Sequence, residues 1–356
     1  MAWFADDGLI LNAADESSAL VKQLWYVSYP DGQTHPITHD LNNYTDVTLT
    51  ADSIALVTVQ SDIQSNVWSA QGGDSNQARQ LTAGKGRDGM DVSWTADGKI
   101  VYDSIVSGNP DIWLMDSDGS NQKQITFDGH FDYNPVASPD GRYIVFISER
   151  TGSPHIWRMN ADGSNPRQLT SGNTNENTPV LTPDGRWVVY ASLSEGGTFW
   201  KVSIDGGNLD QITSTARISD RVKTGGDVRL PSVAPDGQHI ACWSWPDYRE
   251  GSSQRHHMLG ILPFAGGSEV ETLEVPQTTD FAVNLQWSAD GRAVFYVDTR
   301  SGVSNIWSQP LDGGPPKQLT SFKSDRIFGF AWSHDGKLAL SRGNNASDVV
   351  LIRDFK

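Results

Sequence analysis

The sequence predicts an all-β protein built from one short unit that is repeated eight times, and three observations lead to this prediction. Turn-forming residues are abundant, with 34 Gly and 17 Pro among 356 residues. An acidic turn recurs at a nearly constant spacing along the whole chain. The segments between the turns are rich in the β-branched and aromatic residues that favour strands. A helical protein of this length would use more Ala, Glu, Lys and Leu, so we expect little helix.

The fourth repeat shows the pattern most clearly. It begins at Tyr133, passes through a Ser-Pro-Asp-Gly turn at 138–141, and ends with Gln168-Leu-Thr. In such a turn Pro presets φ, Asp bonds to the backbone and Gly accepts a positive φ, so the flanking segments pair as antiparallel strands. The repeat therefore predicts four strands, at 134–137, 142–148, 155–159 and 167–170.

Three motifs recur in the same order along the chain. The acidic turn is found at Asp7, Asp52, Asp97, Asp140, Asp184, Asp236, Asp290 and Asp335. An apolar-Trp pair ends at Trp25, Trp68, Trp113, Trp157, Trp200 and Trp307, and the closing Gln-Leu/Ile-Thr ends at Thr82, Thr126, Thr170, Thr213 and Thr320. A repeat of about 44 residues along the whole chain is the signature of a stacked architecture.

A four-stranded unit of this size cannot bury both of its faces alone, so the units must pack radially around an axis. We therefore predict an eight-bladed β-propeller of four-stranded antiparallel blades, in one domain of residues 1–356, with a seven-bladed ring as the alternative. The repeated tryptophans are expected to lie between neighbouring blades. The predicted repeats are 1–40, 41–82, 83–126, 127–170, 171–213, 214–273, 274–320 and 321–356.

The charge of the chain excludes several classes of partner. There are 43 Asp plus Glu against 27 Lys plus Arg, which gives a formal charge of -16. Nucleic acids and anionic membrane surfaces require a basic face, so neither is an expected partner. The single cysteine, Cys242, excludes a disulfide framework within the chain and a zinc site built from several cysteines. We also expect no signal peptide and no membrane insertion, because the first 20 residues are acidic and no long apolar run occurs.

On these motifs, the chain resembles the TolB-type bacterial β-propellers, whose repeats carry the same acidic turn, Ile-Trp pair and Gln-Leu-Thr. More narrowly, residues 41–52 and 330–355 resemble the C-terminal propellers of bacterial membrane-anchored serine/threonine kinases. The resemblance implies an extracytoplasmic, periplasmic domain that senses or binds a protein. The kinase motifs themselves, a glycine-rich loop, His-Arg-Asp and Asp-Phe-Gly, are absent from the sequence.

No catalytic constellation is evident in the sequence. There is no Gly-x-Ser-x-Gly motif, and no two of the eight histidines occupy the same place on an inner strand. We therefore predict a non-enzymatic recognition propeller, without cofactor or metal, that is a monomer and binds a protein, peptide or small ligand on its funnel face. The alternatives are a metal-dependent lyase or hydrolase centred in the channel, and a propeller scaffold with no activity of its own.

Two surfaces are candidates for ligand contact. The period lengthens around the sixth repeat, where insertions at 214–229 and 246–255 bring basic and aromatic residues into an otherwise acidic chain; a solvated loop is the competing interpretation. The start of each inner strand should line the central funnel, where polar side chains either bind a cationic peptide or hold water. The candidates are Arg221, Arg229, Tyr248, Arg249 and His256 in the first set, and Tyr44, Asp91, Tyr133, Asn177 and Phe328 in the second.

Overall fold

The computed structural model describes residues 1–4, 8–14, 22–40, 42–84, 86–172, 174–192, 198–213, 228–244, 257–266 and 271–353. These residues form strands β1 to β29 and one short 3-10 helix, Ser75–Gln77. No helix among them is long and apolar enough to cross a membrane. The chain divides into two compact units: residues 1–64 with 344–356, and residues 65–343.

The larger unit contains six four-stranded antiparallel sheets, and five of them follow chain order. The first sheet contains β8 (Asp88–Trp94), β9 (Ile100–Ser104), β10 (Asp111–Met115) and β11 (Lys123–Gln124), and the second contains β12 (Asp132–Ala137), β13 (Tyr143–Ser148), β14 (His155–Asn160) and β15 (Arg167–Gln168). The third contains β16 (Glu176–Leu181), β17 (Trp187–Ser192), β18 (Thr198–Ser203) and β19 (Leu209–Gln211), and the fourth contains β20 (Val228–Val233), β21 (His239–Ser244), β22 (Met258–Pro263) and β23 (Glu271–Glu274). The fifth contains β24 (Gln286–Trp287), β25 (Ala293–Arg300), β26 (Val303–Pro310) and β27 (Lys317–Gln318).

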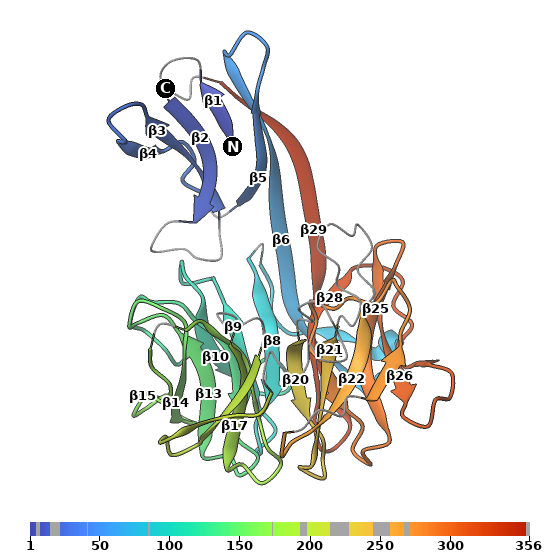
Figure 1. Cartoon of the computed structure of the whole chain (residues 1–356). Helices are drawn as coiled ribbons and strands as arrows, with labels where there is room; N and C mark the ends of the chain where they lie inside the picture. Colours follow the sequence, from blue (N-terminus) through green and yellow to red (C-terminus); the bar gives the residue numbers. More distant parts are fainter. Residues whose placement is uncertain are drawn as a thin grey trace. The chain divides into compact units, whose positions relative to one another are not determined.

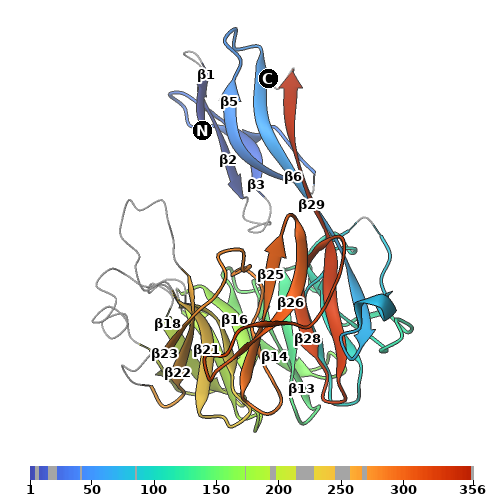
Figure 2. The same cartoon turned by 90° about the vertical axis from the view of Figure 1, so that its right-hand side faces the viewer.

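The sixth sheet joins the two ends of the unit. It consists of β28 (Arg326–Trp332), the first part of β29 (Lys337–Arg353), the last part of β6 (Ala55–Gln71) and β7 (Arg79–Gln80). The inner strands contact one another in the order β28, β8, β12, β16, β20 and β24. The ring closes where the side chains of Asn284 and Gln286 bond to the backbone of Phe330 and Trp332 in β28. Figures 1 and 2 show these sheets from two sides.

The smaller unit is formed by the two ends of the chain. One sheet contains β1 (Ala2–Phe4), β2 (Gly8–Ala14), β3 (Lys22–Ser28) and β4 (Thr34–Pro36). The other contains β5 (Asn43–Leu49), the first part of β6 and the last part of β29. Ile10, Leu24, Tyr44, Val47 and Leu56 form a buried core between these strands.

The all-β propeller of four-stranded antiparallel blades is confirmed, but the predicted count of eight blades is not. Among the described strands, six sheets form the ring. The single domain predicted for 1–356 stays a prediction, and within it the chain forms two compact units. The reason is the length of β6 and β29, which have 17 residues each and belong to both units. The second and eighth repeats therefore share one blade, and β7 of the second repeat is its fourth strand.

The motifs of the repeat are explained by backbone contacts. In the fourth repeat, Ser138 and the N–H of Arg142 both donate to Asp140, which fixes the turn. The hydroxyl of Thr170 accepts the N–H of Ile156, which ties the outer strand to the third strand. Equivalent threonine contacts occur at Thr38, Thr82, Thr126, Thr213 and Thr320. These recurring residues therefore hold the fold and need no ligand to account for them.

The hydrophobic core of the larger unit lies between adjacent blades. One cluster joins Ile112 and Ile125 of one blade to Ile144 and Phe146 of the next, with Trp157 packed against it. This agrees with the predicted position of the repeated tryptophans. Since each blade buries its faces on its neighbours, the inner strands are held rigidly around the central channel.

Candidate functional site

A cavity lies among the inner strands of the larger unit. Its volume is about 90 Å³. Its lining comes from β8, β12, β16, β20 and the segment before β24: Asp91, Val92, Asn134, Pro135, Val136, Thr178, Pro179, Val180, Leu230, Pro231, Asn284 and Leu285. The volume fits the end of one side chain or a few waters, so the cavity is a subsite and does not accept a folded domain.

Irregular backbone shapes the wall of this cavity. Asn134, Thr178 and Leu230 have positive φ angles of 52°, 49° and 55°, and each precedes a proline. The pairing register shifts at each of these positions, as expected of β-bulges. Proline has no N–H for the ladder and is tolerated within sheets at bulges. The dipeptides Asn-Pro, Thr-Pro and Leu-Pro at one place in the repeat are therefore the sequence signal of the channel wall.

Asp91 lines the cavity, and the carboxyl group of Asp103 lies beside it. The N–H of Asp91 donates to Oδ1 of Asp103 at 2.9 Å, and Asp103 is buried on β9. Burial, and then the charge of Asp103, raise the pKa of Asp91 to about 8, while Arg87 and a hydrogen bond with Asn134 oppose the rise. Burial also raises the pKa of Asp103. The pair is held in a place where two negative charges are costly, which favours an incoming cation.

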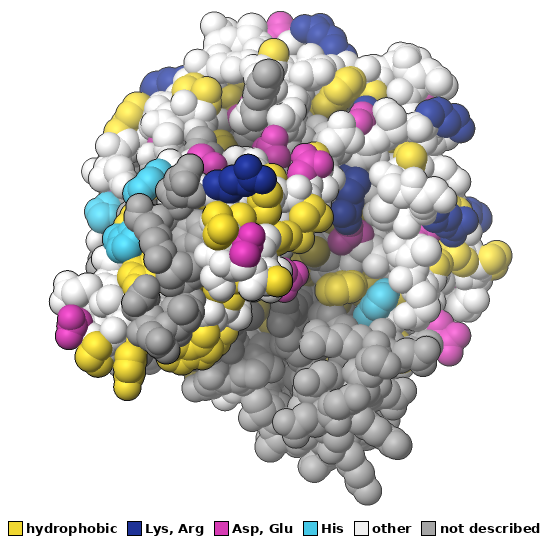
Figure 3. Space-filling model, turned by 90° about the horizontal axis from the view of Figure 1, so that it is seen from above, with side chains coloured by type: hydrophobic (Ala, Val, Ile, Leu, Met, Phe, Trp, Pro, Cys, Tyr) yellow, Lys and Arg dark blue, Asp and Glu magenta, His cyan; other side chains and the backbone are white. Residues whose placement is uncertain are grey.

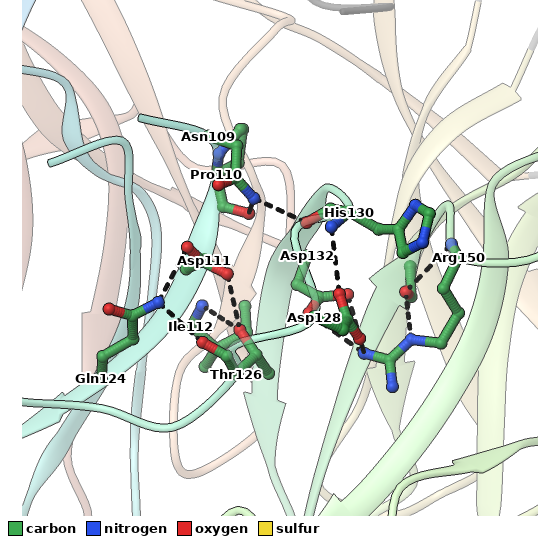
Figure 4. Close-up of polar contacts among 11 residues, drawn as sticks. Asn109, Pro110, Asp111, Ile112, Gln124, Thr126, Asp128, His130, Asp132 and Arg150 are labelled. Atoms are coloured by element: carbon green, nitrogen blue, oxygen red, sulfur yellow. Dashed lines mark hydrogen bonds and ion pairs between the residues drawn. The ribbon is translucent and has the colours of Figure 1, made fainter. Parts of the chain in front are cut away.

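A second set of carboxyl groups lies at the junction of the first two complete blades (Figure 4). One guanidinium nitrogen of Arg150 is 3.0 Å from both carboxylate oxygens of Asp132 and 2.8 Å from Oδ2 of Asp128. The same guanidinium lies over the ring of Trp157, 4.6 Å from its centroid. The carboxyl of Asp132 is fully buried, and burial raises its pKa to about 6 despite Arg150.

Tyr133 lies next in sequence to Asp132 and links the two sets. Its hydroxyl donates to Oε1 of Glu149 at 3.2 Å. Burial, the charge of Glu149 and the more distant charge of Asp91 all raise the pKa of Tyr133, so its hydroxyl stays protonated. Burial also raises the pKa of Glu149.

We refer to these five carboxyl groups together as the acidic sector: Asp91, Asp103, Asp128, Asp132 and Glu149. They outnumber the two cations described beside them, Arg87 and Arg150. Figure 3 shows the described surface from above, with the side chains coloured by type. A sector of this kind attracts a positively charged group and disfavours an anion.

Apolar side chains accompany the acidic sector. Phe127 is 73% exposed and immediately precedes Asp128, and Val106 is 69% exposed in the loop after β9. Asn109 of that loop donates to the carbonyl oxygen of His130 at 2.7 Å, which ties the two loops together (Figure 4). Exposed apolar groups on ordered loops beside charged groups are typical of protein-binding surfaces.

The structure brings together two of the ten predicted site residues, Asp91 and Tyr133. Asn177 and Phe328 lie half-buried on β16 and β28, and Asn177 accepts the N–H of Thr178 at the cavity wall. The prediction that Tyr44 lines the same funnel is wrong: it is buried in the smaller unit, where its hydroxyl donates to Asp40 at 2.7 Å.

The other predicted residues belong to the insertions. The backbone of Arg229 pairs with that of Trp243 on β21, and its side chain lies outside the described residues. Arg221, Tyr248, Arg249 and His256 also lie outside them. The prediction of a basic site at these insertions therefore stays a prediction.

Sequence reasoning missed several members of the site. Asp103 is a charged residue inside the strand Ile100–Ser104, where the equivalent positions of the next blades hold Ile147 and Ala191. That break in the apolar pattern was a usable signal. Arg150 and Glu149 follow a strand without any motif, so only their contacts in the fold identify them.

One buried cluster has the contact order of a serine nucleophile and its base. Ser153 Oγ is 3.0 Å from Nε2 of His155, whose Nδ1 is 2.6 Å from Oε2 of Glu176. However, His155 and Glu176 are both buried, and Thr170 and Thr174 also donate to Glu176. We interpret this cluster as a bond between β14 and the next blade, because the imidazole is closed to a substrate. No group of three or more potential metal ligands occurs among the described residues.

Comparisons with known proteins agree with this fold. Residues 51–220 match the family model described as the TolB beta propeller domain. A putative TolB from Agrobacterium tumefaciens is 18% identical with a TM-score of 0.60, covering 79% of this chain and 98% of its own. TolB from Acinetobacter baumannii is 17% identical with a TM-score of 0.54, over 95% of this chain and 80% of its own. A chain from a nidogen/laminin complex is 14% identical with a TM-score of 0.53, over 74% of this chain and 97% of its own. No curated protein matches the sequence.

Proposed function

We propose that the protein is a recognition propeller that binds an extended, positively charged segment of a partner protein at its acidic sector. The observation that carries this proposal is the Asp91–Asp103 pair, of which Asp91 lines the central cavity. The pKa values of both carboxyl groups are raised, which means that their charged forms are unfavourable there. One ammonium or guanidinium group placed between them would stabilise the charged forms. The exposed Phe127 and Val106 supply apolar contact beside this charge.

The match to TolB propellers supports binding as the function, as does the presence of a similar fold in a nidogen/laminin complex. We propose binding, without a catalytic role, as the function of this site. Following the same resemblance, we propose that the protein works outside the cytoplasm as a monomeric sensor, and that a kinase-associated setting is one form of that role.

The proposal is tested with labelled peptides. A fluorescein-labelled octapeptide of alternating Lys and Ala serves as the probe, and its Glu-Ala counterpart serves as the negative probe. Binding is followed by fluorescence anisotropy. We expect the lysine peptide to bind and its affinity to increase as the pH rises, because the raised pKa values of Asp91 and Asp103 mean that both carboxyl groups become charged only toward neutral or alkaline pH.

Matched variants locate the binding. The double variant Asp91→Asn with Asp103→Asn should lower the affinity for the lysine peptide at least tenfold. Asp118→Asn with Asp162→Asn removes the same charge from turns between the third and fourth strands of two blades and should change the affinity less than threefold. Failure of the lysine peptide to bind, or equal losses in the two double variants, would show that the acidic sector is not the binding site.

A further inference from the structure

The last part of β29 is an unpaired edge in the smaller unit. Strand β29 runs from Lys337 to Arg353, but its pairing with β28 ends at Gly343. From residue 344 onward, β6 is the only described neighbour in the sheet order. Figure 2 shows this part of β29 beside β6, at the margin of the sheet. Along ten residues, the backbone groups directed away from β6 therefore have no strand partner among the described residues.

The side chains of this edge alternate as those of a sheet strand do. Val350 and Ile352 pack against the core of the smaller unit, whereas Val349 is 74% and Leu351 is 49% exposed. The hydroxyls of Ser347 and Ser61 are 3.0 Å apart, so these two residues lie across from each other on β29 and β6. The register that this contact implies places Val59 and Val57 beside Val349 and Leu351. The outer face thus carries an apolar stripe that reaches the free edge.

This edge lacks the features that usually prevent strand pairing. Natural edges are shortened, interrupted by Pro or a bulge, or carry Lys that points outward. Residues 344–353 contain no Pro and no Lys, and their charges are Asp348 and, at the end of the strand, Arg353. An edge that is long, apolar in alternate positions and unprotected is suited to receiving another strand.

The charge of the smaller unit determines what kind of strand fits. Residues 1–64 and 344–356 contain 11 Asp plus Glu against 3 Lys plus Arg, a formal charge of -8. Two copies of this unit would bring like charges together, which disfavours self-association through the edge. A strand with Lys or Arg among its residues would be attracted instead.

We propose that residues 344–353 of β29 accept an extended segment of a partner protein, with alternating apolar and basic residues, which adds to the sheet as a further strand. Its apolar side chains would continue the stripe formed by Val349 and Leu351, and a basic residue would face Asp348. This site is independent of the acidic sector, because every residue that forms it belongs to the smaller unit.

The test uses a fluorescein-labelled decapeptide of alternating Val and Lys with the wild-type protein. Two further peptides carry N-methyl groups on alternate residues, one in each phase, so that each removes the N–H groups of one edge of the peptide. We expect the parent peptide to bind, and one methylated phase to bind at least tenfold more weakly than the other. Absence of binding, or equal binding of both methylated phases, would overturn the proposal.

Variants separate this site from the other candidates. Val349→Lys with Leu351→Lys should lower the affinity for the Val-Lys peptide at least tenfold. Val106→Lys with Phe127→Lys also replaces two exposed apolar residues by Lys, but in the larger unit, and should not lower this affinity. The Asp91→Asn and Asp103→Asn double variant should also leave this peptide bound; if it alone abolishes binding, the peptide occupies the acidic sector and the edge proposal is wrong. A dimer in sedimentation equilibrium that the Val349→Lys and Leu351→Lys variant abolishes would identify a second copy as the occupant, which also overturns it.

Discussion

Replacing Asp91 by Asn tests whether the charge of the carboxyl pair in the channel destabilises the folded protein. The pKa of Asp91 is raised from 3.8 to about 8, with burial as the largest cause and the charge of Asp103 as the next. The folded protein therefore binds a proton that the unfolded chain has released. Stability contributed by this group is present at low pH and is lost as the pH rises from the unfolded pKa to the folded pKa.

The magnitude follows from the shift. One pKa unit corresponds to about 1.4 kcal/mol, so a single group shifted by about four units would cost about 6 kcal/mol at high pH. Asp103 shares the repulsion, and the amide of Asn must also be desolvated in the same place. We therefore expect Asp91→Asn to increase the free energy of unfolding by on the order of 3 kcal/mol at pH 8, and by less than about 1 kcal/mol at pH 4.

The assay is urea unfolding of wild type and variant from pH 4 to pH 8, followed by tryptophan fluorescence. Asp140→Asn is the control of opposite sign. Burial, the largest single effect, raises the pKa of Asp140, but the hydrogen bonds from Ser138 and Arg142 together outweigh it and hold this pKa at about 2. This exposed carboxylate stabilises the protein above its unfolded pKa, so its loss should cost at most about 1 kcal/mol at pH 7. If Asp91→Asn does not increase the free energy of unfolding at pH 8, or increases it equally at every pH, the charge of the carboxyl pair does not destabilise the protein.

Three further substitutions test contacts that hold the ring. Thr170→Val leaves a buried backbone N–H unpaired and removes a donor to Glu176, so chemical denaturation should show a loss of about 1 to 3 kcal/mol. Arg150→Ala leaves the buried carboxyl of Asp132 without its cation and should cost about 3 kcal/mol, and Asp132→Asn in the same chain should recover part of that loss in a double-mutant cycle. Gly329→Ala brings a Cβ against a backbone carbonyl oxygen of β8 and should lower the melting temperature, followed by circular dichroism, by several degrees.

The sequence was sufficient for the blade but not for the number of blades. The Asp-Gly turns, the Ile-Trp pairs and the closing threonines each make a local contact, so their spacing alone predicts a four-stranded unit. The count depends on how β6 and β29 pair, and those strands are almost 300 residues apart in the chain. The sequence pattern of a repeat is the same whether all of its strands form one blade or some of them belong to a second unit.

The candidate site was predicted only in part, for a related reason. Asp91 and Tyr133 could be placed because they lie in the first part of inner strands, which occupy the same place in each repeat. The partners that give them their properties come from elsewhere: Asp103 from the second strand of the blade, and Glu149 from the loop after β13. Which carboxyl groups meet, and how deeply they are buried, depends on the packing of neighbouring blades.

The regular and irregular positions of the repeat have different physical roles, and this separation is the strongest argument for the acidic sector. Residues that recur in most repeats, such as Thr170 and Asp140, satisfy backbone groups that every blade must satisfy. Asp103 makes a contact that the next two blades lack: its Oδ1 accepts the N–H of Asp91, whereas Ile147 and Ala191 stand at the equivalent positions there. A neutral amide oxygen could accept the same N–H, so the charge of Asp103, which raises the pKa of Asp91, is a cost that this contact does not require. A cation bound in the channel would offset that cost, and if Asp103→Asn stabilised the protein and weakened the lysine peptide together, both effects would trace to the same charge.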